Sequence, residues 1–103
     1  MNVSGIQRTI VELARELNVA CKNVSVSVEF GGASWVYTVR LRYRYKLLRG
    51  RNEYHAHAEG SGVLLGEAID RAKDSWRFNR GYDKHQFLTP EPFDGPVEID
   101  EDA

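Results

Sequence analysis

The sequence predicts an α+β domain in the order α-β-β-β-α, with a three-stranded antiparallel meander and both helices packed on one of its faces. Two patterns support this fold class. Apolar residues recur every three to four positions in residues 5–18 and 63–79, as in helices that bury one side. Three segments between them alternate apolar and polar residues, which is typical of strands with one buried face.

The length and the cysteine content indicate a single domain that needs no covalent cross-link. A chain of 103 residues can bury one hydrophobic core, and a single cysteine cannot form an intramolecular disulfide. The sequence shows no secretory signal, and its apolar runs are far shorter than the roughly 20 residues that span a bilayer. We therefore expect a cytoplasmic protein that does not insert into a membrane.

Charge is distributed unevenly along the chain. All 14 lysines and arginines lie in residues 1–90, whereas residues 91–103 contain six acidic residues and no basic one. The same stretch holds two of the three prolines, which exclude a regular helix. We expect one α+β domain over residues 1–88 and an acidic, proline-containing C-terminal tail over residues 89–103 that is extended or disordered.

Each predicted helix carries an apolar stripe with charged residues opposite it, so each should lay one face on the sheet. The stripe of the first helix, over residues 5–18, consists of Ile6, Ile10, Leu13, Ala14 and Leu17. The stripe of the second helix, over residues 63–79, consists of Leu65, Ile69, Ala72 and Trp76.

The strand pattern separates a buried face from an exposed one. The inward residues of the first strand, over residues 24–30, are Val24, Val26, Val28 and Phe30. Those of the long second strand, over residues 34–48, include Trp35, Tyr37, Val39, Leu41, Tyr43 and Tyr45. We assign these aromatic residues to the core rather than to an exposed platform for stacked bases. The small residues Ala56, Ala58 and Gly60 of the third strand would let a helix approach it closely.

Two-residue turns would set the register of both hairpins. Turns at Gly31-Gly32 and Arg49-Gly50 bring inward residues opposite inward residues, and glycine suits the positive φ of hairpin turns. The first turn then pairs Val28 with Trp35. The second pairs Tyr45 with Tyr54 inside, and outside it pairs Lys46 with Glu53, Arg44 with His55, Arg42 with His57 and Arg40 with Glu59.

The outward positions of the second strand form the most unusual surface in the sequence. Arg40, Arg42, Arg44 and Lys46 follow one another there, and we call these four residues the cationic ladder. With the adjoining turn and strand, the candidate partner-binding residues are Arg40, Arg42, Arg44, Lys46, Arg49, Arg51, His55 and His57. The alternative is a solvated face whose opposite charges pair across strands, which stabilises by only about 0.2–1 kcal/mol per pair.

The tail is the second candidate region. Phe87 and Phe93 are spaced as anchors that could pack on the body or insert into a partner, and Asp100 and Glu101 belong to the acidic end. Under one hypothesis the acidic end folds over the cationic ladder and competes with anionic ligands. Under the other it only keeps the chain soluble, and the sequence leaves both open.

No motif for catalysis, metal binding or cofactor binding stands out. His55, His57 and Glu59 share one strand face and are ligand types for zinc and iron, but the neighbouring arginines would repel a cation. Cys21 follows Val19-Ala20, an apolar context in which a cysteine fills space. We therefore expect no metal, no cofactor and no enzymatic activity.

The order of elements resembles that of the double-stranded-RNA-binding domain over about residues 4–78. That family contacts RNA through its first helix, a first hairpin loop with a Gly-Pro-x-His-like sequence and a lysine-rich start of its second helix. Here the first loop is Gly31-Gly32 and the second helix opens Val63-Leu64-Leu65-Gly66-Glu67, without a basic residue. The resemblance implies the fold and transfers neither of these RNA-contacting features.

In its size, its lack of enzymatic motifs and its strongly charged faces, the chain also resembles small phage-encoded proteins that block host defence enzymes, including anti-CRISPR inhibitors. That resemblance implies stoichiometric occlusion of a site on a host protein. We expect a noncatalytic protein-binding module of this kind, with nucleic-acid binding through the arginine-rich sheet face as the alternative. Whether it acts as a monomer or a homodimer stays open.

Overall fold

The computed structural model describes residues 3–96. In chain order its elements are α1 (Val3–Leu17), η1 (Cys21–Asn23), β1 (Val24–Gly31), β2 (Ser34–Leu47), β3 (Glu53–Gly62), α2 (Leu65–Arg80) and β4 (His85–Phe87). The predicted α-β-β-β-α order is confirmed, and two short elements, η1 and β4, are added to it. No helix in this part of the chain is long and apolar enough to cross a membrane.

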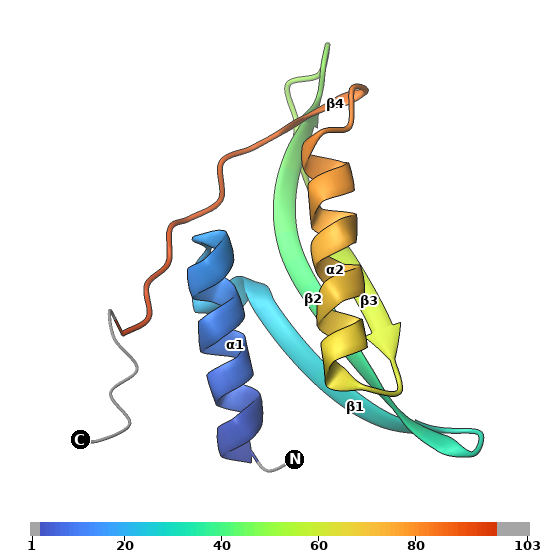
Figure 1. Ribbon diagram of the computed structural model, residues 1–103. Helices are drawn as coiled ribbons and strands as arrows, with labels where there is room; N and C mark the ends of the chain where they lie inside the picture. Colours follow the sequence, from blue (N-terminus) through green and yellow to red (C-terminus); the bar gives the residue numbers. More distant parts are fainter. Residues whose placement is uncertain (1–2, 97–103) are drawn as a thin grey trace.

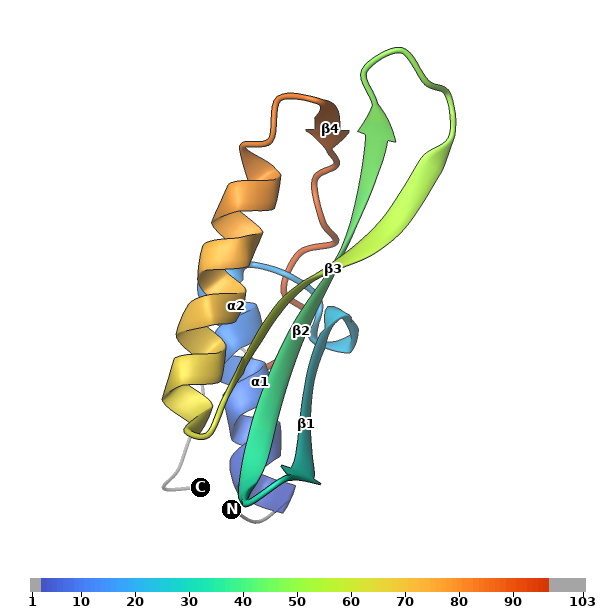
Figure 2. The ribbon, with the colours of Figure 1, turned by 90° about the vertical axis from the view of Figure 1, so that its right-hand side faces the viewer.

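Both helices lie on one face of the sheet (Figure 2), as the sequence predicts. Strand β2 is central, with β1 on one edge and β3 on the other, all antiparallel. Strand β1 pairs with β2 from Ser34 to Leu41, and β4 pairs with it from Tyr45 to Leu47. Because β3 occupies the opposite edge at Tyr45, β1 and β4 share one edge of β2. They leave a gap at Arg42 and Tyr43, since Leu88 N still donates to Arg44 O at 3.0 Å.

The core lies between the inward face of the sheet and the helices. Strand β2 contributes Val39, Leu41 and Tyr43, of which none is more than 6% exposed. The helices and the turn after α1 add Leu13, Ala14, Val19, Ala20, Ala68, Ala72 and Trp76. In the middle of β2, the alternation of the sequence therefore separates buried from exposed residues as predicted.

Helix α2 runs along β2 and β3 (Figure 1) and touches the backbone of β3. Gly60 leaves no room for a Cβ atom, which would collide with backbone atoms of Ala68 and Ala72. Ala58 on the same strand is fully buried. The small residues of β3 thus allow the close approach that the sequence predicts.

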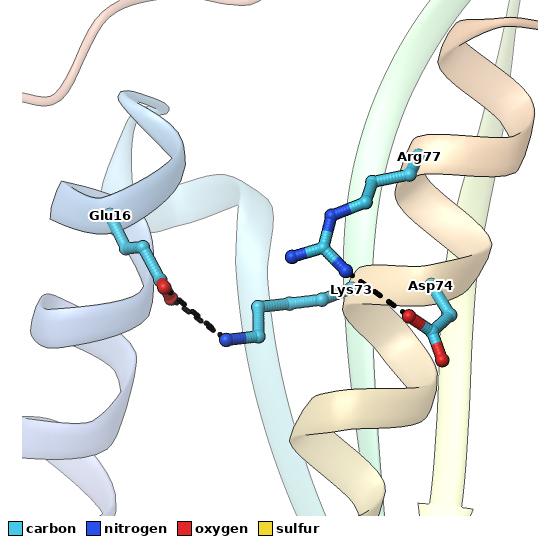
Figure 3. Close-up of polar contacts among 4 residues, drawn as sticks. All are labelled: Glu16, Lys73, Asp74 and Arg77. Atoms are coloured by element: carbon cyan, nitrogen blue, oxygen red, sulfur yellow. Dashed lines mark hydrogen bonds and ion pairs between the residues drawn. The ribbon is translucent and has the colours of Figure 1, made fainter.

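An ion pair links the two helices. Lys73 Nζ of α2 lies 3.2 Å from Glu16 Oε2 of α1 (Figure 3). A second pair in the same figure, Arg77 Nη1 with Asp74 Oδ1 at 3.1 Å, lies within α2. The first ion pair therefore joins two helices, whereas the second lies on the surface of a single helix.

The register predicted for the second hairpin is confirmed. Tyr45 pairs with Tyr54, Lys46 pairs with Glu53, and the remaining predicted outer pairs also form. The connection is longer than two residues, because β2 ends at Leu47 and β3 begins at Glu53. A hydrogen bond of 2.9 Å from Gly50 N to Leu47 O closes its turn.

The register predicted for the first hairpin is wrong by two residues. Val28 pairs with Tyr37 rather than with Trp35. The turn lies one residue later than predicted, at Gly32 and Ala33, and Gly32 has a φ of 62°. A two-residue change in pairing keeps every inward residue inward. The alternation alone therefore does not distinguish the predicted turn from the observed one.

Two aromatic side chains that the sequence assigns to the core are exposed. Phe30 is 62% and Trp35 is 59% exposed. Both lie at the end of the β1–β2 hairpin, which extends past the first turn of α2 (Figure 1). Tyr43 is buried, and Tyr37 and Tyr45 are half-buried against the core. The prediction fails at the hairpin end because alternation gives the face of a residue, not the reach of the covering helix.

The segment after α2 packs back onto the body. Phe87 of β4 stacks on Tyr43, with ring centroids 5.1 Å apart, and meets the ring of Trp76 edge-on. Residues 89–96 then run extended past the end of α1 (Figure 1). The division into a domain of residues 1–88 and a separate tail stays a prediction.

Candidate functional site

The cationic ladder occupies the outer face of β2, which points away from both helices. Its members alternate with the buried inward residues of the strand. Arg40 and Arg42 are exposed, and Arg44 and Lys46 are half-buried. Within residues 3–96, neither helix covers this face (Figure 2), so the ladder is accessible to a ligand or a partner.

Two members of the ladder pair with carboxylates of β3. Arg40 Nε bonds Oε1 of Glu59, its predicted neighbour, at 2.5 Å. Arg44 Nη1 donates to Oε2 of Glu53 at 3.0 Å, which lies diagonally across the strands, although His55 is its partner in register. The four charged side chains are between 41% and 49% exposed, so each pair contributes at most about 1 kcal/mol.

The other cations of the face have no carboxylate partner among residues 3–96. Arg42 Nη2 lies 3.3 Å from His55 Nδ1, while His57, its partner in register, is exposed. Lys46 is half-buried near the end of β2, next to the turn that leads to β3. Four cations of this face and its adjoining turn therefore have no carboxylate partner in this part of the chain: Arg42, Lys46, Arg49 and Arg51.

A cavity of about 220 Å³ opens beside the ladder, at the gap that β1 and β4 leave on one edge of β2. In the register of β4, Pro90 would face Arg42, but proline has no N–H to donate to a strand. The pairing therefore stops, and side chains line the gap. The lining residues are Lys22, Asn23, Arg42, Tyr43, Arg44, His55, Pro90 and Glu91.

The C-terminal segment forms one wall of this cavity. Glu91 O accepts a hydrogen bond of 2.9 Å from Ala20 N, and the Glu91 carboxylate lies 2.9 Å from Lys22 Nζ. Phe93 N donates to Asn18 Oδ1 at 3.1 Å. These contacts bring the residues around η1 against a segment more than 70 positions later, which no local sequence pattern reveals.

Both aromatic anchors of the predicted tail contact the body. Phe87 lies in the aromatic cluster described above, and Phe93 is half-buried against the core. The guanidinium carbon of Arg15 lies 5.4 Å from the centroid of the Phe93 ring, a cation–π contact of about 0.5–1 kcal/mol. Asp100 and Glu101 lie outside the described residues, so competition by the acidic end at the ladder stays a hypothesis.

Cys21 lies next to the C-terminal segment, where its surroundings favour the neutral thiol. Burial raises the pKa of Cys21, and a hydrogen bond to Asp94 raises it further. Asp94 Oδ1 also accepts a hydrogen bond of 2.9 Å from Cys21 N, which holds the pKa of Asp94 below its ordinary value. A thiol with a raised pKa carries little thiolate near neutral pH and is a poor nucleophile.

The histidines of β3 do not gather around a common point. Glu59 is bonded to Arg40, and His55 contacts Arg42. Within residues 3–96 no group of three or more His, Cys, Asp or Glu side chains is placed to hold a metal ion.

The exposed pair formed by Phe30 and Trp35 is a surface feature that sequence reasoning missed. Their rings meet edge-on, with centroids 5.2 Å apart and an angle of 65° between the planes. The available signal was their position beside the turn, at the end of a hairpin that is longer than the helix packed on it. We call these two residues the aromatic pair.

The chain matches no protein-family model, no curated protein and no solved structure. Its function therefore has to be argued from the chemistry of its surfaces.

Proposed function

We propose that this chain is a noncatalytic protein-binding module of the cytoplasm. The observation that carries the proposal is the aromatic pair, whose two side chains are both more than half exposed at the end of a hairpin that extends beyond α2 (Figure 1). Adjacent exposed aromatic rings are a feature of surfaces that another molecule covers. Tryptophan and phenylalanine are enriched in the buried centres of protein interfaces.

The cationic ladder supplies the second element of such an interface. Arginine is also enriched among the residues that dominate binding energy, and Arg42 is exposed without a carboxylate partner in residues 3–96. The carboxylates of Glu53 and Glu59 lie between the cations. A face of mixed charge suits the mixed charge of a protein surface and sets the orientation of binding.

The mode of action in this proposal is stoichiometric occlusion of a site on the partner. It rests on the resemblance to small phage-encoded inhibitors of the anti-CRISPR kind. The small size of the chain and its projecting hairpin are consistent with it, because a narrow hairpin can enter a groove that a globular surface cannot.

Nucleic-acid binding is the second candidate, favoured by one observation. Lys46, Arg49 and Arg51 lie close together in sequence at one end of β2 and lack carboxylate partners among residues 3–96. Cations of this kind bind phosphates in a salt-dependent way. The carboxylates of Glu53 and Glu59 on the same face oppose this reading, because they would repel a phosphate backbone.

The test combines partner capture with a nucleic-acid titration. The intact chain, Trp35→Ser, Arg42→Ala/Arg44→Ala and Phe78→Ser are each immobilised and exposed to a cell extract. Phe78 is 68% exposed on α2 and its ring lies 5.9 Å from that of Tyr82, so Phe78→Ser breaks a second pair of exposed aromatic rings and is the matched control for Trp35→Ser. We expect a captured protein that is lost with Trp35→Ser, reduced with the double arginine variant and retained with Phe78→Ser.

The nucleic-acid arm measures binding to duplex DNA, single-stranded DNA and duplex RNA over a range of salt concentrations. Binding that weakens steeply with salt and with Arg42→Ala/Arg44→Ala, together with no aromatic-dependent capture, would replace the protein-binding proposal with the second candidate. Capture that is the same for Trp35→Ser and Phe78→Ser would remove the aromatic pair as the anchor.

A further inference from the structure

The cavity at the gap in β2 differs from the aromatic pair in shape and in chemistry. We infer that it binds a single phosphate group, held by Lys22, Arg42 and Arg44. This inference goes beyond the proposed function, because it needs no protein partner. The two share only Arg42 and Arg44, so each can fail without the other.

The charge of the lining selects the class of ligand. Its charged members are three cations and one carboxylate, Glu91, and Arg44 is also paired with Glu53 from outside the lining. One positive charge is left over, so the lining favours an anion. Arginine also matches the geometry of phosphate oxygens with paired N–H groups.

The three cations approach the cavity from two sides. Arg42 and Arg44 lie two positions apart on β2, so they project from the same face roughly 7 Å apart. Lys22 comes from η1, on the other side of the gap. Donors from two walls suit a tetrahedral group, whose oxygens point in different directions.

The arginines keep donors for such a ligand. Arg42 uses Nη2 towards His55, and Arg44 uses Nη1 towards Glu53. Each guanidinium has five N–H donors. These existing contacts fix the two side chains beside the cavity while leaving other N–H groups for an oxyanion.

The volume of the cavity sets the size of the ligand. About 220 Å³ is well above the roughly 10–15 Å³ of such space that admits one water molecule. That is enough for a phosphate group and a few attached atoms. Inorganic phosphate and a small phosphate monoester both carry the required chemistry.

Glu91 acts as an internal competitor in this site. Its carboxylate lies 2.9 Å from Lys22 Nζ, so an incoming phosphate must compete for that ammonium group. The backbone of Glu91 is held separately, through its carbonyl and Ala20 N. Removing the carboxylate charge therefore leaves the wall of the cavity in place.

The experiment is an NMR titration of the intact, ¹⁵N-labelled chain with inorganic phosphate at constant ionic strength. We expect saturable shifts at the amides of Lys22, Asn23 and Tyr43, which line the cavity. Arg42→Gln should weaken the affinity about tenfold or more, because it removes a charge-assisted hydrogen bond. Arg49→Gln removes the same charge from the turn outside the lining and should change the affinity less than about twofold.

Glu91→Gln tests the competitor and gives a change in the opposite direction. We expect phosphate to bind about two- to fivefold more tightly, which is the range of an exposed ion pair. Glu29→Gln, which removes a carboxylate from an exposed position of β1, is its matched control and should leave the affinity unchanged.

Three results would overturn the inference: shifts that do not saturate, equal losses in Arg42→Gln and Arg49→Gln, or equal gains in Glu91→Gln and Glu29→Gln. O-phosphoserine in a parallel titration distinguishes the sources of the group. Tighter binding than inorganic phosphate supports a site for phosphate esters, and equal or weaker binding supports a site for free phosphate.

Discussion

The two helices are attached to the sheet in different ways. Helix α2 lies along β2 and β3 (Figure 1), with Gly60 in contact with its backbone. Helix α1 stands beside this unit, joined to it by core residues, by the ion pair from Glu16 to Lys73 and by residues 89–96. The attachment of α2 is thus encoded in one continuous stretch, whereas that of α1 needs residues from the far end of the described chain.

The largest effect is expected where α2 meets β3. Gly60→Val would drive its side chain into the backbone at Ala68 and Ala72, which cannot yield without lifting the helix. We expect a loss of at least about 3 kcal/mol in the free energy of unfolding, or failure to fold. Thermal and urea denaturation measure it.

The control for that variant lies in α2 itself, away from the contact with β3. A Cβ added at Gly66 would have nothing within 4 Å, so Gly66→Ala should leave the stability unchanged or raise it by about 0.5–1 kcal/mol. Similar stabilities for Gly60→Val and Gly66→Ala would refute the backbone contact between α2 and β3.

The attachment of α1 should respond to Phe93→Ala. The Phe93 ring is half-buried and lies against Arg15, so we expect a loss of about 1–2 kcal/mol. Amide exchange should speed up at Ala20, which is bonded to Glu91 O, and change less within α2. Phe78→Ala, at an exposed ring, should stay within about 0.5 kcal/mol of the parent.

If Phe93→Ala speeds up amide hydrogen exchange in α2 as much as at Ala20, the two helices are not attached independently.

A smaller effect is expected at the ion pair between the helices (Figure 3). Lys73 is only 18% exposed, whereas Glu16 is 56% exposed, so Glu16→Gln should destabilise by about 0.5 kcal/mol. A double-mutant cycle with Lys73→Met measures the coupling. The exposed pair of Asp74 and Arg77 within α2 is the control, and a cycle there should show less coupling and no change in exchange at α1.

The smallest effect is expected from the titration of Asp94. Its hydrogen bond from Cys21 N lowers its pKa below the ordinary value of 3.8. The stabilisation it provides is complete above that ordinary value and is lost as the pH falls through the lower pKa of the folded state. The Cys21 amide signal should therefore change with a midpoint below pH 3.8, and Asp94→Asn should abolish that change. A midpoint above 3.8 would contradict the contact.

The two hairpins show how far the sequence pattern reaches. For the second hairpin, the alternation and the turn predict the same register, with Tyr45 opposite Tyr54, and the structure shows that register. In the first, Gly31, Gly32 and Ala33 offer two neighbouring turns that both keep valines opposite inward residues. Alternation has a period of two, so a change in pairing by two residues is invisible to it.

The cationic ladder was predictable because it depends only on alternation within one strand. Its partners were predictable in part, since Arg40 meets Glu59 as expected, but a long side chain can also reach diagonally, as Arg44 does to Glu53. The cavity and β4 were not predictable. They depend on residues 85–96 meeting segments that are distant in the sequence, and a three-residue strand carries too few positions to show a period.

The shared edge of β2 has a consequence for the order in which the chain folds. Strand β1 is next to β2 in the sequence, but β4 follows it by about 40 residues and closes a much larger loop. Contacts that close large loops form late. We expect the pairing at Tyr45–Leu47 to form after the two hairpins, and until residues 85–87 reach it this strand edge is open to other chains.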